Sequence, residues 1–397
     1  MILVDPPSWP AHGRLWSHLV SDRSPAELHD FARRLGIPER GFARDHYDVP
    51  AQRYDAVVAA GAVPVGSREL VRRLAASGLR RRGGTPGPYA PGSPLQRPRR
   101  LRPGDGVAIV APAGPVPVDL LDEGIAVLES WGLVVRPGRH LRTHHPALEH
   151  LAATDRERAT DLRAAWCDPE VAAVWAARGG FGCHRIVDVI DWSALAAAGP
   201  RVLVGFSDVT ALHEAVAERL GLATVHGPVV TSLGHRRACA AAREQVRRLL
   251  FEPDDARTLA TQLRRLAGGA ADGVLVGGNL RVLAAGLGTA VSRPARGAIA
   301  VLEDVGEQAY RIDGMLTQLL RTGWFDGVRG VVAGAFTQTG DTDVEAVLRD
   351  RLGPLQVPAV TGAPVGHIGD NIALPLGVPA RLDADAGTLV LTRAPLA

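Results

Sequence analysis

A serine lies where a predicted strand gives way to a predicted helix. In VLVGFSDVTALHEAVAERLG (202–221) an apolar strand ends at Gly205, and Ser207 follows just before a helix that starts at Asp208. A serine at such a turn is presented above the sheet, and the first N–H groups of the helix point toward negative charge developing beside it. An acyl-transfer nucleophile needs this position. The alternative is that Ser207 is only a helix N-cap, because serine is among the commonest capping residues.

The helix that follows has a clear pattern. Its apolar residues Val209, Leu212, Val216 and Leu220 share one face. Glu214 and Glu218 fall on the opposite face, and Gly221 is placed to end the helix.

A serine nucleophile needs a base, and the chain has 13 histidines. His213 lies one turn into the helix behind Ser207, and we interpret it as a packed or surface histidine. His367 lies in a glycine-rich loop, PVGHIGDN (364–371), from which a side chain can project into a cleft. The chain has no lysine, since every one of its 45 basic residues is arginine, so a serine–lysine dyad is excluded and histidine is the base.

The base in turn needs a carboxylate that holds its tautomer. Glu303 closes the apolar strand GAIAVLED (297–304) in the expected position. Asp304 and Glu307 are alternatives that spacing alone does not exclude.

A glycine-rich segment, RGGFG (178–182), follows another apolar strand. Its glycines let backbone N–H groups approach a ligand closely, so it could form half of an oxyanion hole with the N–H of Asp208 as the other half. It is not a nucleotide fingerprint, because the spacing G-x-G-x-x-G and a lysine-containing phosphate loop are both absent.

Strands and helices alternate around these residues. Strand-like segments at 107–114, 171–180 and 202–208 are apolar throughout, and 119–131 is helical in pattern. Such strands predict a parallel sheet covered on both faces.

Beyond about residue 270 the pattern changes to short strands at 297–304 and 328–336. One helix between them has Ile312, Met315, Leu316 and Leu319 at helical spacing. We therefore expect a second subdomain.

Arginine is concentrated in one Pro- and Gly-rich stretch. Residues 80–104 hold seven arginines and no acid, which predicts a linker (81–101) between a small unit (1–80) and a large one. The formal charge is 45 − 42 = +3, and without this stretch it becomes 38 − 42 = −4. The basic pI of about 9.0 is thus a local property, and a nucleic-acid partner is not expected.

Other whole-chain features narrow the class of protein. Cys167, Cys183 and Cys239 are widely spaced and odd in number, which fits neither a disulfide framework nor a zinc-ligand pattern. No apolar stretch reaches the ~18 residues of a membrane span, and the start, 1–10, has neither a basic leader nor a hydrophobic run. We expect a cytoplasmic protein without a membrane partner.

Six segments, taken in order, carry a family resemblance. They are RGGFGCHRIVDVIDW (178–192), GFSDVTALH (205–213), HGP (226–228), GGNLRVLAAGLGT (277–289), LEDVGEQAYRIDGMLTQL (302–319) and GAPVGHIGDNIALPLG (362–377). Together they resemble the LD-carboxypeptidases, the serine peptidase family that also contains the microcin C self-immunity peptidase. The resemblance covers about residues 102–397. Phe181, Phe206 and Ile368 depart from residues common in the family, which leaves the substrate more open than the mechanism.

The resemblance implies a Ser-Glu-His triad that cuts an amide bond, with Ser207 as nucleophile, Glu303 as orienting acid and His367 as base. It places the oxyanion donors on the backbone of Gly180 and Asp208. It also implies an α/β fold in which a flavodoxin-like parallel-sheet subdomain (102–258) precedes a small, β-rich, swivelling C-terminal subdomain (270–397), often in a homodimer.

The expected substrate is a muropeptide tetrapeptide that loses its terminal D-Ala. Its carboxylate would need a cation, for which Arg185 and Arg311 are candidates, and Asn279 could hydrogen-bond substrate or only stabilise its turn. No metal or organic cofactor is implied. The alternatives are a peptidyl- or aminoacyl-nucleotide amide as substrate, a non-catalytic sensor of cell-wall fragments, and nucleic-acid binding through the linker.

Residues 1–80 resemble a separate small bacterial α/β domain of uncharacterised function, on the segments VDPPSWPAHGRLWSHLVSD (4–22) and DHYDVP (45–50). Its possible metal ligands or acid/base groups are Asp5, His12, His18, Asp22, Asp45, His46 and Asp48. The alternative interpretation is structural: Ser24 and Glu27 form a capping box on a helix (25–36), Trp9 and Trp16 are core residues, and the histidines are surface or structural.

Overall fold

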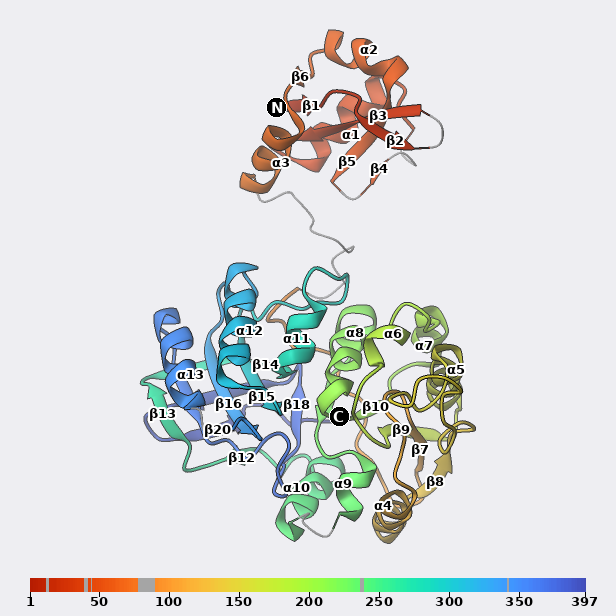
Figure 1. Ribbon diagram of the computed structural model, residues 1–397, viewed down its shortest axis with the longest axis vertical. Helices are drawn as coiled ribbons and strands as arrows, with labels where there is room; N and C mark the ends of the chain where they lie inside the picture. Colours follow the sequence, from red (N-terminus) through yellow and green to blue (C-terminus); the bar gives the residue numbers. More distant parts are fainter. Residues whose placement is uncertain (12–13, 39–41, 44, 78–89, 236–238, 341–342) are drawn as a thin grey trace. The chain divides into compact units, whose positions relative to one another are not determined.

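The computed structural model describes residues 1–397 except 12–13, 39–41, 44, 78–89, 236–238 and 341–342 (Figure 1). The chain divides into two compact units, Met1–Pro86 and Gly87–Ala397. Within the described ranges no helix has the length and apolar character needed to cross a bilayer.

The N-terminal unit is a small mixed sheet with helices. Its strand order is β4 (Phe42–Ala43), β5 (His46–Pro50), β3 (Arg14–Ser21), β1 (Ile2–Val4) and β6 (Val63–Pro64), and β2 (Trp9–Ala11) pairs with β3. The helices are α1 (Pro25–Arg34), the short 3-10 turn η2 (Ala51–Arg53), α2 (Tyr54–Ala59) and α3 (Ser67–Ala76). One face of the sheet packs on α1 and α2 through Val4, Leu19, Phe31, Tyr47 and Val57, and Leu3 and Val20 pack on α3.

Two expectations for this unit need correction. Ser24 does cap α1 by accepting a hydrogen bond from Glu27 N at 3.2 Å, but the Glu27 carboxylate binds Ser21 Oγ and the terminal amine instead of closing a capping box. Trp16 is only half-buried and lies outside the apolar core. The side chain of Trp9, like His12, falls outside the described part of the chain.

The first sheet of the large unit carries the serine. Its strand order is β8 (Val134–Pro137), β7 (Gly106–Val110), β9 (Val171–Ala176), β10 (Val202–Gly205) and β11 (Thr224–His226), all parallel. In chain order this is 2-1-3-4-5, the flavodoxin-like arrangement that the family resemblance implied. A sixth strand from the C-terminal part, β18 (Leu374–Leu376), adds antiparallel to β11.

Helices cover both faces of this sheet, which explains its continuously apolar strands. They are α4 (Val118–Ser130), α5 (Asp155–Cys167), α6 (Cys183–Ile186), α7 (Trp192–Ala198), α8 (Thr210–Leu220), α9 (Val230–Gly234) and α10 (Ala240–Phe251). Alternate residues of one strand face opposite layers: Trp175 packs with the layer of α4 and α10, and Val174 with that of α5 and α8. Figure 1 shows these helices on the two sides of the sheet.

The C-terminal part is larger than expected. Its eight-stranded mixed sheet has the order β12 (Thr258–Ala260), β20 (Thr388–Leu391), β19 (Pro379–Asp383), β14 (Ala270–Asn279), β15 (Ala298–Val305), β16 (Gly330–Thr337), β17 (Ala359–Thr361) and β13 (Arg264–Ala267). Helices α11 (Leu280–Gly286), α12 (Ala309–Arg321) and α13 (Val344–Leu352) and the 3-10 turn η4 (Gly353–Leu355) complete it. This part is not a small, separate subdomain, because one apolar core spans both sheets and β18 belongs to the other sheet.

Residues 90–101 also differ from the predicted linker. Leu95 and Leu101 are buried, and Leu95 N donates to Gly377 O at 2.9 Å. The arginines are engaged, since Arg99 pairs with Asp105 at 2.7 Å and Arg100 with Asp254 at 3.0 Å. This half of the stretch packs as an edge of the large unit because its leucines find apolar partners and its arginines find acids; 81–89 lie outside the described residues.

Candidate active site

The turn after β10 holds Ser207 in an unusual backbone conformation. Ser207 has φ 63°, in the left-handed region that costs a non-glycine residue about 1–2 kcal/mol. A 3-10 turn, η3 (Ser207–Val209), leads directly into α8, which Gly221 ends with φ 65°. The strand, strained residue and helix form the turn that exposes a nucleophile above a parallel sheet.

Three side chains from three parts of the chain form one hydrogen-bonded line. His367 Nε2 lies 3.0 Å from Ser207 Oγ, and His367 Nδ1 lies 2.8 Å from Glu303 Oε2. Glu303 is fully buried, whereas the His367 side chain is 22% exposed. Serine, imidazole and carboxylate therefore have the order and spacing of a nucleophile, a base and an orienting acid.

Glu303 is held close to the histidine loop. A Cβ added at Gly366, where φ is 120°, would lie 2.7 Å from Glu303 Oε2. Gly366 N also donates to Asn371 Oδ1 at 2.9 Å. Only glycine lets this backbone pass the carboxylate, so the loop sets the imidazole directly above the acid.

The two alternatives to Glu303 have other partners. Asp304 accepts hydrogen bonds from Asn279 Nδ2 and from the backbone N–H groups of Arg281 and Val305. Burial raises the pKa of Asp304 to about 6. Glu307 lies 2.5 Å from Arg281 Nη1, so only Glu303 contacts the imidazole among the three.

The glycine-rich loop lies beside the serine. A Cβ added at Gly179 would be 2.8 Å from Ser207 Cβ and 2.9 Å from its Oγ, so a glycine is required there. Gly180, with φ 114°, follows in the same turn. Asp208 Oδ2 accepts a hydrogen bond from Cys183 N at 2.7 Å, which ties this loop to the serine turn.

The buried Arg158 also holds the glycine-rich loop in place, and its role was not predicted from the sequence. Its Nη1 donates to Gly182 O at 2.9 Å and to Pro112 O, and its Nη2 pairs with Asp155. The guanidinium thereby joins the loops that follow β7 and β9. No sequence signal marked it, because an arginine in a helix is usually exposed.

Two buried histidines lie beneath the triad. His213 Nε2 lies 2.8 Å from Gly205 O, and burial lowers its pKa to about 4. Burial lowers the pKa of His226 to about 3, and its ring packs edge-on against Phe206. Both rings are neutral at pH 7, so they place no positive charge below His367.

The expected polar face of α8 is wrong at Glu214. It is buried, and its Oε1 accepts a hydrogen bond from Arg293 N at 3.1 Å. Burial raises the pKa of Glu214 to about 8. The helix lies between two layers, so its second face is covered as well.

A cavity of about 450 Å³ opens beside His367. Phe206 and Ile368 line it near the base, and Arg243 and Cys239 line it from the side of α10. Its volume is in the range of small-ligand sites. A lining that combines apolar side chains with an arginine suits a small substrate with an anionic group.

The residues proposed to bind substrate are otherwise engaged. Arg185 makes a two-pronged ion pair with Asp155 at 2.9–3.1 Å, and Arg311 lies beside Tyr310 Oη and Glu307. Asn279 is buried and caps α11 by accepting from Val282 N at 3.2 Å. The structure does not bring these three side chains into the triad; Asn279 takes the turn-stabilising role.

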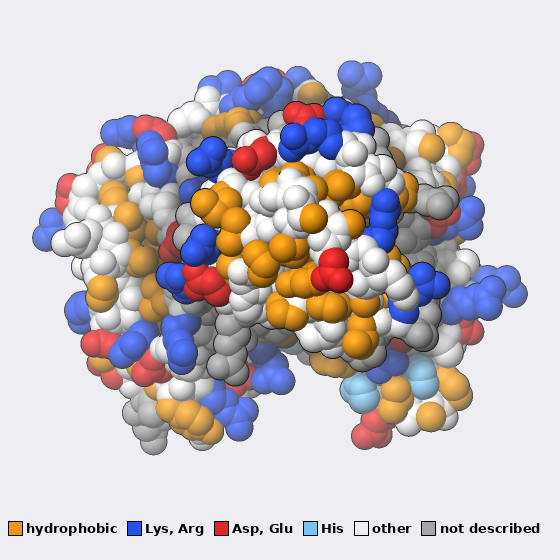
Figure 2. Space-filling view, turned by 90° about the horizontal axis from the view of Figure 1, so that it is seen from above, with side chains coloured by type: hydrophobic (Ala, Val, Ile, Leu, Met, Phe, Trp, Pro, Cys, Tyr) orange, Lys and Arg blue, Asp and Glu red, His pale blue; other side chains and the backbone are white. Residues whose placement is uncertain are grey.

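The charged side chains do not form a single basic face in the view of Figure 2. Arginine side chains (blue) there are interspersed with acidic ones (red). Many arginines are paired, as with Arg136 and Glu170 at 2.5 Å. A nucleic-acid surface would need unpaired positive charge gathered along one groove.

Family models match three parts of the chain. Residues 107–227 match the LD-carboxypeptidase N-terminal domain, and 272–382 match the LD-carboxypeptidase C-terminal domain. Residues 2–77 match a protein of unknown function, DUF4031.

Curated relatives agree with these matches. A putative carboxypeptidase of Streptomyces coelicolor is 52% identical over 303 residues, which are 75% of this chain and 97% of the relative. A murein tetrapeptide carboxypeptidase of Pseudomonas aeruginosa is 37% identical over 298 residues, 72% of this chain and 95% of the relative.

Solved structures share the fold. A muramoyltetrapeptide carboxypeptidase from Oxalobacter formigenes has a TM-score of 0.63 at 31% identity and covers 72% of this chain and 97% of its own. The microcin C7 self-immunity protein has a TM-score of 0.70 at 20% identity, over 76% of this chain and 99% of its own.

Proposed function

Because the chain belongs to the LD-carboxypeptidase family, we propose that it is a serine carboxypeptidase that releases the terminal D-Ala from muropeptide tetrapeptides in the cytoplasm. The bond cleaved joins the L-centre of a diamino acid to D-Ala. The observation that carries this proposal is the line from Ser207 Oγ through His367 to Glu303.

In the proposed reaction Ser207 Oγ attacks the carbonyl carbon while His367 Nε2 takes the hydroxyl proton. Glu303 holds the Nδ1–H and stabilises the imidazolium. The N–H groups of Gly180 and Asp208 stabilise the oxyanion, and the imidazolium gives its proton to the leaving D-Ala nitrogen. Water, deprotonated by the same imidazole, then attacks the acyl-enzyme and frees Ser207.

Binding of the terminal carboxylate is assigned to Arg243 in this proposal. Arg243 and His367 line the same cavity, which brings a guanidinium to the space beside the proposed base. A guanidinium can bind a carboxylate through two hydrogen bonds. Changing Arg243 to Gln should therefore raise KM more than it lowers kcat.

The substrate class follows relatives that are 31–37% identical and are named for murein or muramoyl tetrapeptides. The microcin C7 self-immunity protein is 20% identical, a level that supports the fold alone.

The deciding experiment incubates the full chain with L-Ala-D-Glu-meso-diaminopimelate-D-Ala and measures free D-Ala. We expect release by the wild type and a loss of about 10⁴-fold or more in kcat for Ser207→Ala. Equal release by both proteins would refute the proposal. Cleavage of a peptidyl-nucleotide amide but not of the tetrapeptide would support the triad and reject the substrate.

A further inference from the structure

Three strands of the N-terminal unit place a row of polar side chains on one face of the sheet. In the antiparallel pair β3–β5, His18 lies directly opposite Asp48. On the other side of β3, His18 and Asp5 face one another, since Asp5 N donates to His18 O at 3.2 Å and His18 N to Asp5 Oδ1 at 2.6 Å. Carboxylate, imidazole and carboxylate thus follow one another from the residue after β1, across β3, to β5.

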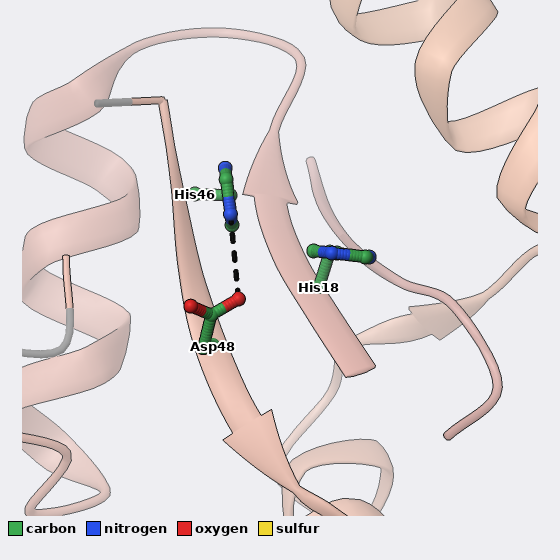
Figure 3. A group of neighbouring side chains, drawn as sticks. All are labelled: His18, His46 and Asp48. Carbon is green, nitrogen blue, oxygen red and sulfur yellow. Dashed lines mark ion pairs between the residues drawn. The ribbon is translucent and has the colours of Figure 1, made fainter. Parts of the chain in front are cut away.

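His46 joins the row from the same strand as Asp48. The two residues are separated by one position, so their side chains point to the same face, while Tyr47 between them points into the core. His46 Nε2 lies 3.4 Å from Asp48 Oδ1, and the rings of His18 and His46 stand 5.1 Å apart, edge to face (Figure 3). One donor atom from each of His18, His46 and Asp48 lies within 4.8 Å of the other two.

Each imidazole has its own orienting carboxylate. His18 Nδ1 lies 3.1 Å from Asp5 Oδ2, and His46 Nδ1 lies 2.7 Å from Asp45 Oδ1. These contacts assign Nδ1 as the outer nitrogen of both rings and direct Nε2 inward. Histidines that bind metals are held in this way, by a carboxylate on the nitrogen that does not bind the ion.

We propose that His18 Nε2, His46 Nε2 and an oxygen of Asp48 bind one divalent transition-metal ion of the Zn²⁺ type. Two imidazoles and one carboxylate are ligands that such ions accept. In tetrahedral coordination at about 2.1 Å, ligand atoms lie about 3.4 Å apart. His46 Nε2 and Asp48 Oδ1 already have this separation, and the His18 ring would have to move toward them by about 1 Å.

The proposed centre is open on one side. The side chains of His18, His46 and Asp48 are 24%, 25% and 46% exposed, whereas Asp5 is 1% exposed. Three protein ligands leave at least one coordination position for water or an anionic ligand, the arrangement of catalytic rather than structural zinc sites.

Asp22, one of the acids considered with this group, has a different role. It pairs with the terminal amine of Met1 at 2.7 Å. Among the described residues, the proposed metal group therefore consists of three ligands and two orienting acids.

The test is titration of the metal-free full chain with Zn²⁺ alone, followed by calorimetry. We expect one equivalent to bind, and we expect His18→Ala, His46→Ala and Asp48→Asn each to raise Kd at least 100-fold. Asp45→Asn should raise Kd by about 10–100-fold, because Asp45 acts through His46. His144→Ala, at an exposed histidine of the other unit, should leave Kd unchanged.

A second measurement separates ligation from folding. Co²⁺ bound in place of Zn²⁺ should give visible absorption bands that Asp45→Asn shifts and Asp48→Asn abolishes, at unchanged far-UV circular dichroism. Asp48 is partly exposed, so its variant is expected to fold. Absence of stoichiometric binding, or the same Kd in the wild type and Asp48→Asn, would overturn the proposal.

Discussion

Asp208, the residue after the proposed nucleophile, accepts a hydrogen bond from the backbone N–H of Cys183 at 2.7 Å. Asp208 is buried, and burial raises the pKa of its carboxyl. The contact fixes the glycine-rich loop before Cys183 to the serine turn. The two backbone N–H groups assigned to the oxyanion hole, one on each segment, are thus held by a side chain that does not itself touch the reacting atoms.

Asp208→Ala should weaken both activity and folding. It leaves the buried Cys183 N–H without its acceptor, which costs about 1–3 kcal/mol of unfolding free energy. The variant keeps the backbone N–H at position 208, but Gly180 becomes free to shift. A displacement near 1 Å lowers kcat by about 10²-fold. Urea unfolding and D-Ala release measure the two effects. Asp191→Ala, which removes the cap of α7, is the matched control and should lower stability alone. A normal kcat in Asp208→Ala would contradict the positioning role.

Ser207→Gly should be more stable than Ser207→Ala, although both lack the nucleophile. Alanine keeps the Cβ that is strained at φ 63°, whereas glycine adopts this conformation freely. The expected difference in unfolding free energy is about 1 kcal/mol, measured by urea denaturation of both variants at one pH. Equal midpoints at equal slopes would mean that the turn holds no strain at Ser207.

Glu214→Gln should flatten the pH dependence of stability. The carboxyl has an ordinary pKa of 4.5 and a folded pKa raised to about 8 by burial, so the folded chain keeps a proton that the unfolded chain has released. This contribution is complete below pH 4.5 and is lost as pH rises toward 8, by up to about 1.4 kcal/mol per pH unit. Gln can still accept the hydrogen bond from Arg293 N.

Denaturant unfolding of the wild type and Glu214→Gln between pH 5 and 8 provides the measurement. The wild type should lose stability relative to the variant as pH rises. Parallel curves would show that Glu214 is ionised in the folded protein at neutral pH.

Alkylation of Cys239 should inhibit the enzyme. Cys239 is exposed and lines the cavity beside His367, whereas Cys183 is buried and its thiol pKa is raised well above its usual value by burial. A maleimide adduct on Cys239 would fill part of the 450 Å³ space and lower kcat/KM for the tetrapeptide by at least 10-fold. Cys239→Ser should retain activity and resist the reagent. Full activity of the alkylated protein would place substrate outside this cavity.

Local patterns in the sequence predicted the elements around the nucleophile. The change from an apolar strand to a 3.6-residue period predicted the strand-to-helix turn at Ser207. The glycine-rich loop singled out His367, which the structure brings within 3.0 Å of Ser207 Oγ. The acid that faces the imidazole is determined by the register of β15 and by the close approach of the Gly366 backbone to the Glu303 carboxylate. Spacing in the sequence therefore did not exclude Asp304 and Glu307 as alternatives to Glu303.

Long-range packing was not visible in the sequence. The arginines at 97–100 were interpreted as charges of a linker. Their partners are Asp105, Asp254 and carbonyls near the C-terminus, which come close to them only in the folded chain. Glu214 read as a surface residue because its helical face gave no sign of a covering layer. The sequence offered Arg185 as a candidate to bind the substrate carboxylate or as a structural residue, and in the structure it pairs with Asp155.

Strand β18 has a consequence for how the enzyme is assembled. His367 lies seven residues before Leu374, and Leu374 pairs with His226 at the edge of the sheet that carries Ser207. The proposed base is therefore anchored to the same sheet as the proposed nucleophile Ser207, while Glu303 comes from the neighbouring sheet. A chain cut between the two halves would have to reassociate before the three side chains could meet.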